Sequence, residues 1–245
     1  MDAFDKELYQ VAEQGSENWH KIRAGRFTAS EIHRLMKSGS RDMSPEELKQ
    51  RPKEGKGSKS KKIEDPNLMS PDTVTYIRTK VAEVLTGRVV EGRMSGPMLD
   101  GIEWEPYAAE YYKQKFGVEL EIAGFKMFGD HAGGSIDRRI VGVNKLLEIK
   151  CPESATHVGY LSLVDQWDLK REKPEYYWQC MSNIHFGNFD GAVFMSFDFR
   201  MIEDRHKYVT IDIKPIAEDI DLIDTKIAAA VKEKLILLKD LNAIR

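Results

Sequence analysis

The sequence predicts one α/β domain, in which a central mixed β-sheet is flanked by helices, and three observations support this fold class. The chain has 245 residues, of which 41% are hydrophobic, and this is enough for one large core. The hydrophobic pattern has the period of a helix over much of the chain but alternates, as in strands, between residues 118 and 150. Neither an internal repeat nor a second core pattern divides residues 1–245.

Helical spacing and end signals predict the helices. Thr28 and Glu31 have the spacing of a capping box, Ser70 is a cap residue followed by proline, and Gly87 and Gly117 suit the residue after a helix. In chain order, the predicted helices cover residues 17–23, a segment that begins near Thr28 or Ser30, and residues 71–86, 97–116, 154–164, 174–186 and 216–241. The apolar stripe of the last helix is expected to pack on the sheet, and a contact between subunits is the alternative.

Alternating hydrophobic residues between turn residues predict the strands. They cover residues 118–122, 125–128, 132–141, 145–150, 191–199 and 206–213. The first four should form the core of a sheet, and the last two should pair as in a hairpin.

Residues 38–70 have no hydrophobic period and are rich in Gly, Ser, Pro and Lys, so we expect a flexible basic insertion within the domain. Residues 49–62 hold seven Lys or Arg and one acid. A solvated mobile loop is the expected state, and a finger that contacts phosphates is the alternative.

Charge and cysteine content exclude several classes of protein. The 37 Lys and Arg nearly balance the 40 Asp and Glu, for a net charge of -3, so the chain does not coat nucleic acid by overall positive charge. Cys151 and Cys180 form no CxxC pair, which argues against structural zinc and favours a reducing compartment. No apolar stretch has the length of a membrane span, and the N-terminus does not resemble a secretory signal. We therefore expect a cytoplasmic protein without a membrane partner.

Three ionisable residues are predicted to meet on one side of the sheet. Asp137 lies near the end of one strand, and Glu148 and Lys150 lie two positions apart on the next, so they share a face. The carboxylates and the backbone carbonyl of Ile149 are hard oxygen ligands that suit Mg²⁺ or Mn²⁺, and Lys150 could hold a water that attacks a phosphodiester. An ordinary surface ion pair is the alternative, but the neighbouring residues are apolar.

The same residues form the D…ExK pattern of the PD-(D/E)xK nuclease superfamily, and further segments extend the likeness over nearly the whole chain. These are residues 13–23, 28–31, 82–87, 101–105, 135–137, 148–152 and 176–179. Taken in this order, they resemble the phage lambda-type alkaline exonucleases of the YqaJ-like viral recombinase family. This resemblance implies a restriction-endonuclease-like core. Ile136 departs from the pattern, which usually has proline there.

The resemblance implies roles for several residues at a metal site. Asp137, Glu148 and the Ile149 carbonyl would bind Mg²⁺, in two ions per site with Mn²⁺ as a substitute, and Lys150 would position the attacking water. Glu105 would lie near the metals as a further ligand, and Gln179 would face the active site. Without the resemblance, Glu105 is more typical of a solvated helix face and Gln179 of a structural helix.

A second set of residues matches the family's pocket for a 5′-terminal phosphate: Arg23, Ser30 and Ser135. A guanidinium binds phosphate through two hydrogen bonds, and hydroxyls add donors. Trp19 could stack on a terminal base or fill the core. Thr28 and Ser30 could also simply cap a helix.

The function implied by the resemblance is that of a Mg²⁺-dependent 5′→3′ exonuclease acting on double-stranded DNA ends. It would leave a 3′ single strand for phage-type recombination by strand annealing, as a homotrimeric ring with a single-strand annealing protein as partner. The alternatives are an endonuclease of the same superfamily, a catalytically idle module that binds DNA ends, and a phosphoesterase for small molecules.

Overall fold

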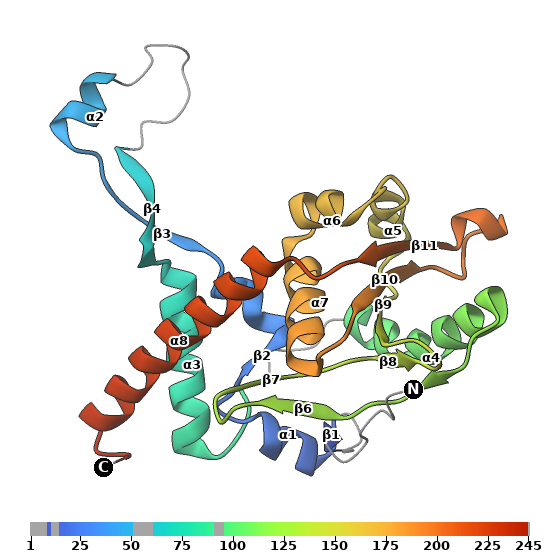
Figure 1. Ribbon diagram of the computed structural model, residues 1–245, viewed down its shortest axis with the longest axis horizontal. Coiled ribbons are helices and arrows are strands. Elements are labelled where there is room, and N and C mark those ends of the chain that lie inside the picture. The colour runs from blue at the N-terminus through green and yellow to red at the C-terminus, as the bar shows by residue number, and fades with distance from the viewer. Residues whose placement is uncertain (1–8, 11–14, 51–60, 91–95, 245) are drawn as a thin grey trace.

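The computed structural model describes residues 9–10, 15–50, 61–90 and 96–244 (Figure 1). A body of sheets and helices carries one projecting arm, formed by β3 (Ser38–Asp42), α2 (Pro45–Gln50) and β4 (Lys62–Met69).

The central sheet has five strands, and its order is β11 (Tyr208–Ile213), β10 (Gly191–Phe197), β9 (Lys145–Lys150), β8 (Arg138–Ile140) and β5 (Leu120–Glu121). Strands β9 and β10 are parallel and the other neighbours are antiparallel, so the predicted mixed sheet and the β10–β11 pair are confirmed. Every residue of β10 is buried, as expected where helices cover both faces of a sheet.

A second sheet of four strands has the order β1 (Tyr9–Gln10), β6 (Phe125–Phe128), β7 (Ala132–Ser135) and β2 (Phe27–Thr28). The prediction of one strand over residues 132–141 is therefore wrong, because β7 and β8 belong to different sheets and Ile136 and Asp137 lie between them. At this junction, the side chain of Asp137 accepts a hydrogen bond from the backbone N–H of Ile149, 2.7 Å away. The break in the strand thus places Asp137 beside β9.

Two helices cover the two faces of the central sheet. Helix α4 (Gly96–Phe116) packs with Leu147 and Ile149, while α7 (Pro174–Gly187) packs with Leu146. Because strand side chains alternate, Glu148 and Lys150 lie on the α7 side with Leu146.

The signals at helix ends are confirmed in part. Helices α1 (Glu17–Arg23) and α3 (Pro71–Thr86) lie where predicted, with Ser70 as the cap of α3 and Gly87 in the left-handed conformation, at φ 65°. The capping box is wrong, because η2 (Ala29–Arg34) is a 3₁₀ helix without a capping bond from Thr28.

The helix predicted over residues 154–164 is also wrong beyond Tyr160. There, α5 (Ser154–Tyr160) ends and α6 (Gln166–Glu172) begins, since the Asp165 side chain accepts from two backbone N–H groups of the new helix. A short 3₁₀ helix, η3 (Asp204–His206), precedes β11.

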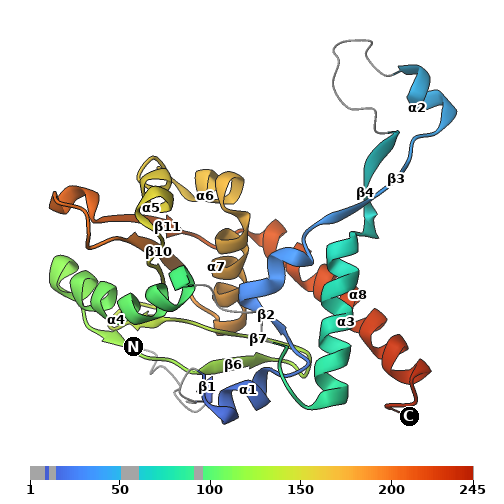
Figure 2. The same cartoon turned by 180° about the vertical axis from the view of Figure 1, so that it is seen from behind.

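Helix α8 (Ala217–Asp240) matches the predicted helix, but its apolar stripe does not lie on the sheet. Ile223, Ile227 and Leu238 are buried, and the helix packs against α3 and α7 (Figure 2). The expected packing on the sheet is therefore wrong. None of the described helices combines the length and the apolar character needed to cross a membrane.

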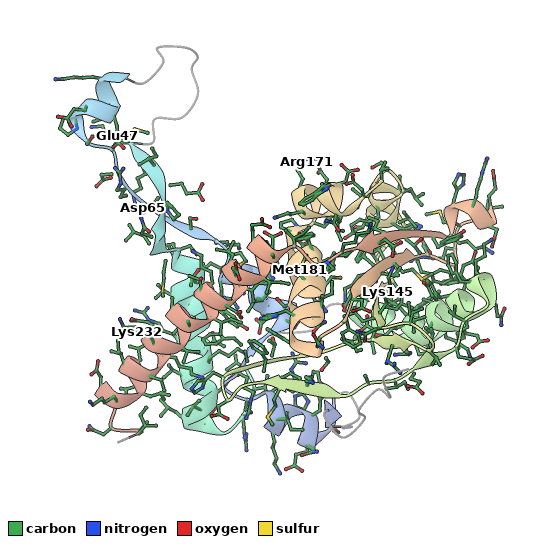
Figure 3. All side chains as sticks on the ribbon, viewed as in Figure 1. Glu47, Asp65, Lys145, Arg171, Met181 and Lys232 are labelled. Atoms are coloured by element: carbon green, nitrogen blue, oxygen red, sulfur yellow. The ribbon has the colours of Figure 1, made fainter. Side chains whose placement is uncertain are left out.

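The arm corrects the prediction of an irregular segment over residues 38–70. Its antiparallel strands β3 (Ser38–Asp42) and β4 (Lys62–Met69) are joined through α2 (Pro45–Gln50), and Arg41 binds Glu47, 2.8 Å away. Glu47 and Asp65 lie far from Met181 in the body (Figure 3). Most arm residues are exposed, so its strands show no hydrophobic period. Residues 51–60 of the basic segment lie outside the described residues.

One buried lysine makes the stability of the fold dependent on pH. Lys234 is 2% exposed, and burial, followed by the charges of Arg26 and Lys80, lowers the pKa of its ammonium to about 8, although Glu83 opposes this shift. Between pH 8 and 10.5, the unfolded state therefore binds more protons, and the free energy of unfolding rises with pH.

We expect the free energy of unfolding of the wild-type protein, relative to Lys234→Met, to rise by about 2 kcal/mol between pH 7 and 9.5. Urea denaturation of both proteins across this pH range measures the difference. A constant difference would show that Lys234 titrates in the folded protein as it does in water.

Candidate active site

A cavity of about 560 Å³ lies where α1, β2, α4, β9 and α7 meet. Nearly all the candidate residues from the sequence line it: Trp19, Arg23, Thr28, Ser30, Glu105, Ser135, Asp137, Ile149, Lys150 and Gln179. The remaining candidate, Glu148, is fully buried beside Lys150. The fold thus brings together residues that are up to 160 positions apart in the chain.

Glu148 and Lys150 form an ion pair, with Lys150 Nζ 2.5 Å from Glu148 Oε1. Gln179 Nε2 donates to the same oxygen from α7. Because Glu148 is 0% exposed, the alternative of an ordinary surface ion pair is wrong. The other oxygen, Glu148 Oε2, is buried and has no hydrogen-bond partner within the described part of the chain.

Glu105 approaches from α4. Its Oε1 accepts a hydrogen bond of 2.9 Å from Arg138, and its side chain is only 19% exposed. A solvated helix face, the alternative for this residue, is therefore wrong. Arg138 also donates to the backbone carbonyl of Asp137, so it links the two acidic residues.

Burial and mutual repulsion act on these carboxyl groups. Burial, and next the charge of Asp137, raise the pKa of both Glu148 and Glu105. Although burial lowers it, the charges of Glu148 and Asp137 raise the pKa of Lys150 overall, so the ammonium stays protonated. Cys151 also lines the cavity, but burial and the nearby acids raise the pKa of its thiol to about 12, which rules out a thiolate nucleophile at neutral pH.

The residues present fit a divalent cation with oxygen ligands. Asp137, Glu148 and the Ile149 carbonyl are hard donors, which suit Mg²⁺ or Mn²⁺ better than zinc. Glu148 Oε2 is left without a partner, and an added positive charge would offset the repulsion among the acids. The described residues contain no cluster of three or more His, Cys, Asp or Glu side chains arranged for a metal. Instead, the carboxylates are bound to Ile149, Lys150 and Arg138.

The residues expected to hold a phosphate form a second group on the cavity wall. The guanidinium of Arg23 lies 3.8 Å from the centroid of the Trp19 ring, and Trp19 Nε1 donates to Ser135 Oγ, 3.3 Å away. The hydroxyls of Thr28 and Ser30 are 3.3 Å apart. Trp19 belongs to neither core cluster of the described residues, so the alternative of a core residue is wrong.

Sequence reasoning missed three residues of the site: Arg138, Tyr176 and Asn183. Tyr176 lies beneath the ammonium of Lys150, at 5.4 Å, and Asn183 donates to the backbone carbonyl of Ser135 at 3.0 Å. With Gln179, these residues occupy positions i, i+3 and i+7 of α7, which is one face of a helix. Polar residues at that spacing on a mostly apolar helix were the signal in the sequence.

Comparison with known proteins finds this architecture elsewhere. A family model described as the YqaJ-like viral recombinase domain matches residues 18–190. An alkaline exonuclease from Laribacter hongkongensis is similar in fold, with a TM-score of 0.69, 22% sequence identity, and coverage of 93% of this chain and 97% of that chain. Its complex with dAMP gives the same TM-score at 23% identity, with the same coverage.

A phage-related exonuclease from Haemophilus somnus has a TM-score of 0.65 at 14% identity, with coverage of 88% of this chain and 96% of that chain. A search of curated proteins finds no match. These likenesses show the fold, while the family model extends over the segments that carry the cavity.

Proposed function

Because this chain belongs to the YqaJ-like viral recombinase domain family, we propose that it is a 5′→3′ exonuclease that acts on double-stranded DNA in the presence of Mg²⁺. It would digest one strand from a 5′-phosphorylated end and leave a 3′ overhang for recombination by strand annealing. The observation that carries this proposal is one cavity that holds both the acid and lysine group and the Trp19, Arg23 and Ser135 group.

The residues at the acidic end of the cavity divide the work of phosphodiester hydrolysis. A divalent ion held by Asp137, Glu148 and the Ile149 carbonyl, with Glu105 beside them, would stabilise negative charge on the phosphate oxygens, and two such ions per site are part of this proposal. Mn²⁺ should substitute for Mg²⁺ because both prefer oxygen ligands. Lys150 is protonated, so its N–H groups can orient an attacking water by donation and its charge can offset that of the phosphate.

The other end of the cavity suits a terminal phosphate. Arg23 can donate two parallel hydrogen bonds to phosphate oxygens, and the hydroxyls of Ser30 and Ser135 add further donors. The ring of Trp19, against which the guanidinium of Arg23 lies, also lines the cavity and would offer an aromatic surface to a terminal base. A 5′-phosphate bound at this end would place a neighbouring phosphodiester toward Lys150.

A nuclease assay tests the proposal. We expect a linear duplex with 5′-phosphates to be degraded much faster than one with 5′-hydroxyls, covalently closed circles to remain intact, and EDTA to stop the reaction. Gel analysis of strand-specific labels gives the polarity. Equal attack on closed circles would indicate an endonuclease, and hydrolysis of nucleotides alone would indicate a phosphoesterase.

We also propose a homotrimeric ring and a single-strand annealing protein as partner. A ring would reconcile a net charge of -3 with DNA binding, because basic residues can line a channel while the outer surface stays acidic. Light scattering with and without DNA measures the number of subunits.

A further inference from the structure

The turn at Gly25 connects the two segments that carry the proposed phosphate site. Helix α1 with Trp19 and Arg23 precedes it, and β2 and η2 with Thr28 and Ser30 follow it. Gly25 has φ +74°, and a Cβ at this position would lie 2.5 Å from Val84 Cγ2 of α3. The turn therefore packs directly on α3, beside β2 (Figure 2), and its conformation and the space around it both require glycine.

Buried charged side chains bind both backbone groups of Gly25. Its N–H donates to Glu83 Oε2 of α3 at 2.8 Å, and its carbonyl accepts from Lys234 Nζ of α8 at 2.8 Å. Glu83 is 1% exposed and Lys234 is 2% exposed. Two helices from distant parts of the chain thus fix one residue of the turn from its two sides.

These charges are fully engaged by the protein. Glu83 also accepts from Lys80 Nζ at 3.0 and 3.1 Å and from the backbone N–H of Val90 at 3.2 Å, and Lys234 lies 3.1 Å from His131 Nδ1. Burial of ions is costly, and apolar residues of similar size often stabilise a core equally well. The contacts of Glu83 and Lys234 with Gly25 are therefore better explained by the geometry that they impose on the turn than by stability alone.

We propose that Glu83 and Lys234 are positioning residues for the terminal phosphate. They fix Gly25 so that Arg23, before the turn, and the Thr28 and Ser30 hydroxyls, after it, face the same cavity. A third contact supports the far side of the turn, where the Thr28 N–H donates to the Tyr76 hydroxyl at 3.0 Å. This inference rests on the proposed exonuclease function, and it assigns the positioning of the phosphate-binding residues in the cavity to two side chains outside it.

The test compares initial rates at pH 7.5 on duplexes with 5′-phosphate and 5′-hydroxyl ends. In Glu83→Ala, we expect the ratio of kcat/KM for the phosphorylated end to kcat/KM for the hydroxyl end to fall roughly 10-fold. This is less than the roughly 100-fold loss that a 1 Å misplacement can cause, and it should result from a higher KM for the phosphorylated end. Lys234→Met should have the same effect, because Lys234 binds the carbonyl of the same glycine from a different helix, α8. Glu83→Gln keeps an oxygen that accepts from Gly25 N–H, so it should retain most of the preference. Arg23→Gln removes the guanidinium itself, so its preference for phosphate gives the lowest value expected among these variants.

Leu238→Ala is the matched control, since Leu238 is an apolar residue buried on α8, one turn from Lys234. It should lower stability and leave the phosphate preference unchanged. A preference that survives in Glu83→Ala and Lys234→Met, or that falls equally in Leu238→Ala, overturns the positioning role. Equal rates of the wild-type protein on both ends overturn the proposed end recognition together with this role.

Discussion

Replacing Lys150 with alanine is expected to reduce DNA cleavage by at least about 100- to 1,000-fold, the usual effect of removing one donor that acts on developing charge. Binding of DNA ends should persist, because Trp19, Arg23 and Ser135 lie in the other part of the cavity. Single-turnover cleavage and fluorescence anisotropy, measured on the same phosphorylated duplex, separate the two properties.

The ion pair with Glu148 complicates this variant. Removing one partner of a buried pair commonly destabilises a protein by about 3 to 5 kcal/mol. Here the loss should be smaller, because burial and Asp137 already raise the pKa of Glu148, and the carboxyl can take up a proton. Thermal melting checks that the variant is folded at the assay temperature.

Lys145→Ala provides the matched control for Lys150→Ala. Lys145 begins the same strand and pairs with Asp212 on the exposed surface, 2.8 Å away. The Lys145→Ala variant should cleave DNA at the wild-type rate. Wild-type activity of Lys150→Ala would contradict the mechanism, and loss of both cleavage and end binding would indicate a role in the fold. A wild-type protein that binds ends without cutting them would be the idle binding module.

The elements that could be predicted from the sequence are those in which local pattern and tertiary environment agree. Helix α3 has a serine cap, a proline in its first turn and a glycine stop, and β9 and β10 are short apolar runs between turn residues. The prediction of one strand over residues 132–141 was wrong because the alternation of hydrophobic residues continues through a junction between two sheets. A period shows which residues are apolar, and it does not show which sheet they join.

The prediction for the arm was wrong for the opposite reason. Strands β3 and β4 pair with each other and both of their faces are largely exposed, so nothing in their composition distinguishes them from a loop. Similarly, α6 begins because Asp165 caps it directly after another helix ends, and the apolar pattern runs across that boundary. Pairing between two separate strands formed the arm, and hydrogen bonds from backbone N–H groups to the Asp165 side chain began α6.

For the site, the D…ExK spacing identified Asp137, Glu148 and Lys150 as a group, and the structure brings all three together. Gln179 depended on the resemblance, since nothing in a buried helix shows that one amide will contact a carboxylate from another element. Arg138 was missed because its importance lies in a tertiary contact with Glu105. The polar spacing on α7 marks Asn183 as facing the same way as Gln179, but it does not show that its partner is the Ser135 carbonyl.

Replacing Glu148 with glutamine is expected to abolish stabilisation of the protein by Mg²⁺ together with its cleavage of DNA. A ligand that binds only the folded state at 100 times its Kd raises the free energy of unfolding by about 2.7 kcal/mol. The wild-type protein should gain stability in this way as Mg²⁺ is added. The variant should not, because the buried carboxylate oxygen that lacks a partner has become part of a neutral amide.

In EDTA, the order of stability should be different. The raised pKa of Glu148 shows that its charge is unfavourable in the folded protein without metal, because of burial and then of Asp137. A glutamine removes that charge and can still accept from Lys150, so Glu148→Gln should melt at or above the wild-type temperature. A higher melting temperature of the variant would mean that the charge of Glu148, which the proposed function needs, lowers the stability of the protein without metal.

Differential scanning calorimetry with EDTA and with increasing Mg²⁺ measures both effects without DNA. Glu110→Gln is the control, since Glu110 is an acid on the exposed side of α4, 57% exposed, where the loss of a charge should not alter the response to Mg²⁺. If Glu148→Gln responds to Mg²⁺ as the wild-type protein does, Glu148 is not a ligand. The carboxylates would then act on Lys150 alone, and the proposed metal site would be wrong even if the nuclease activity were real.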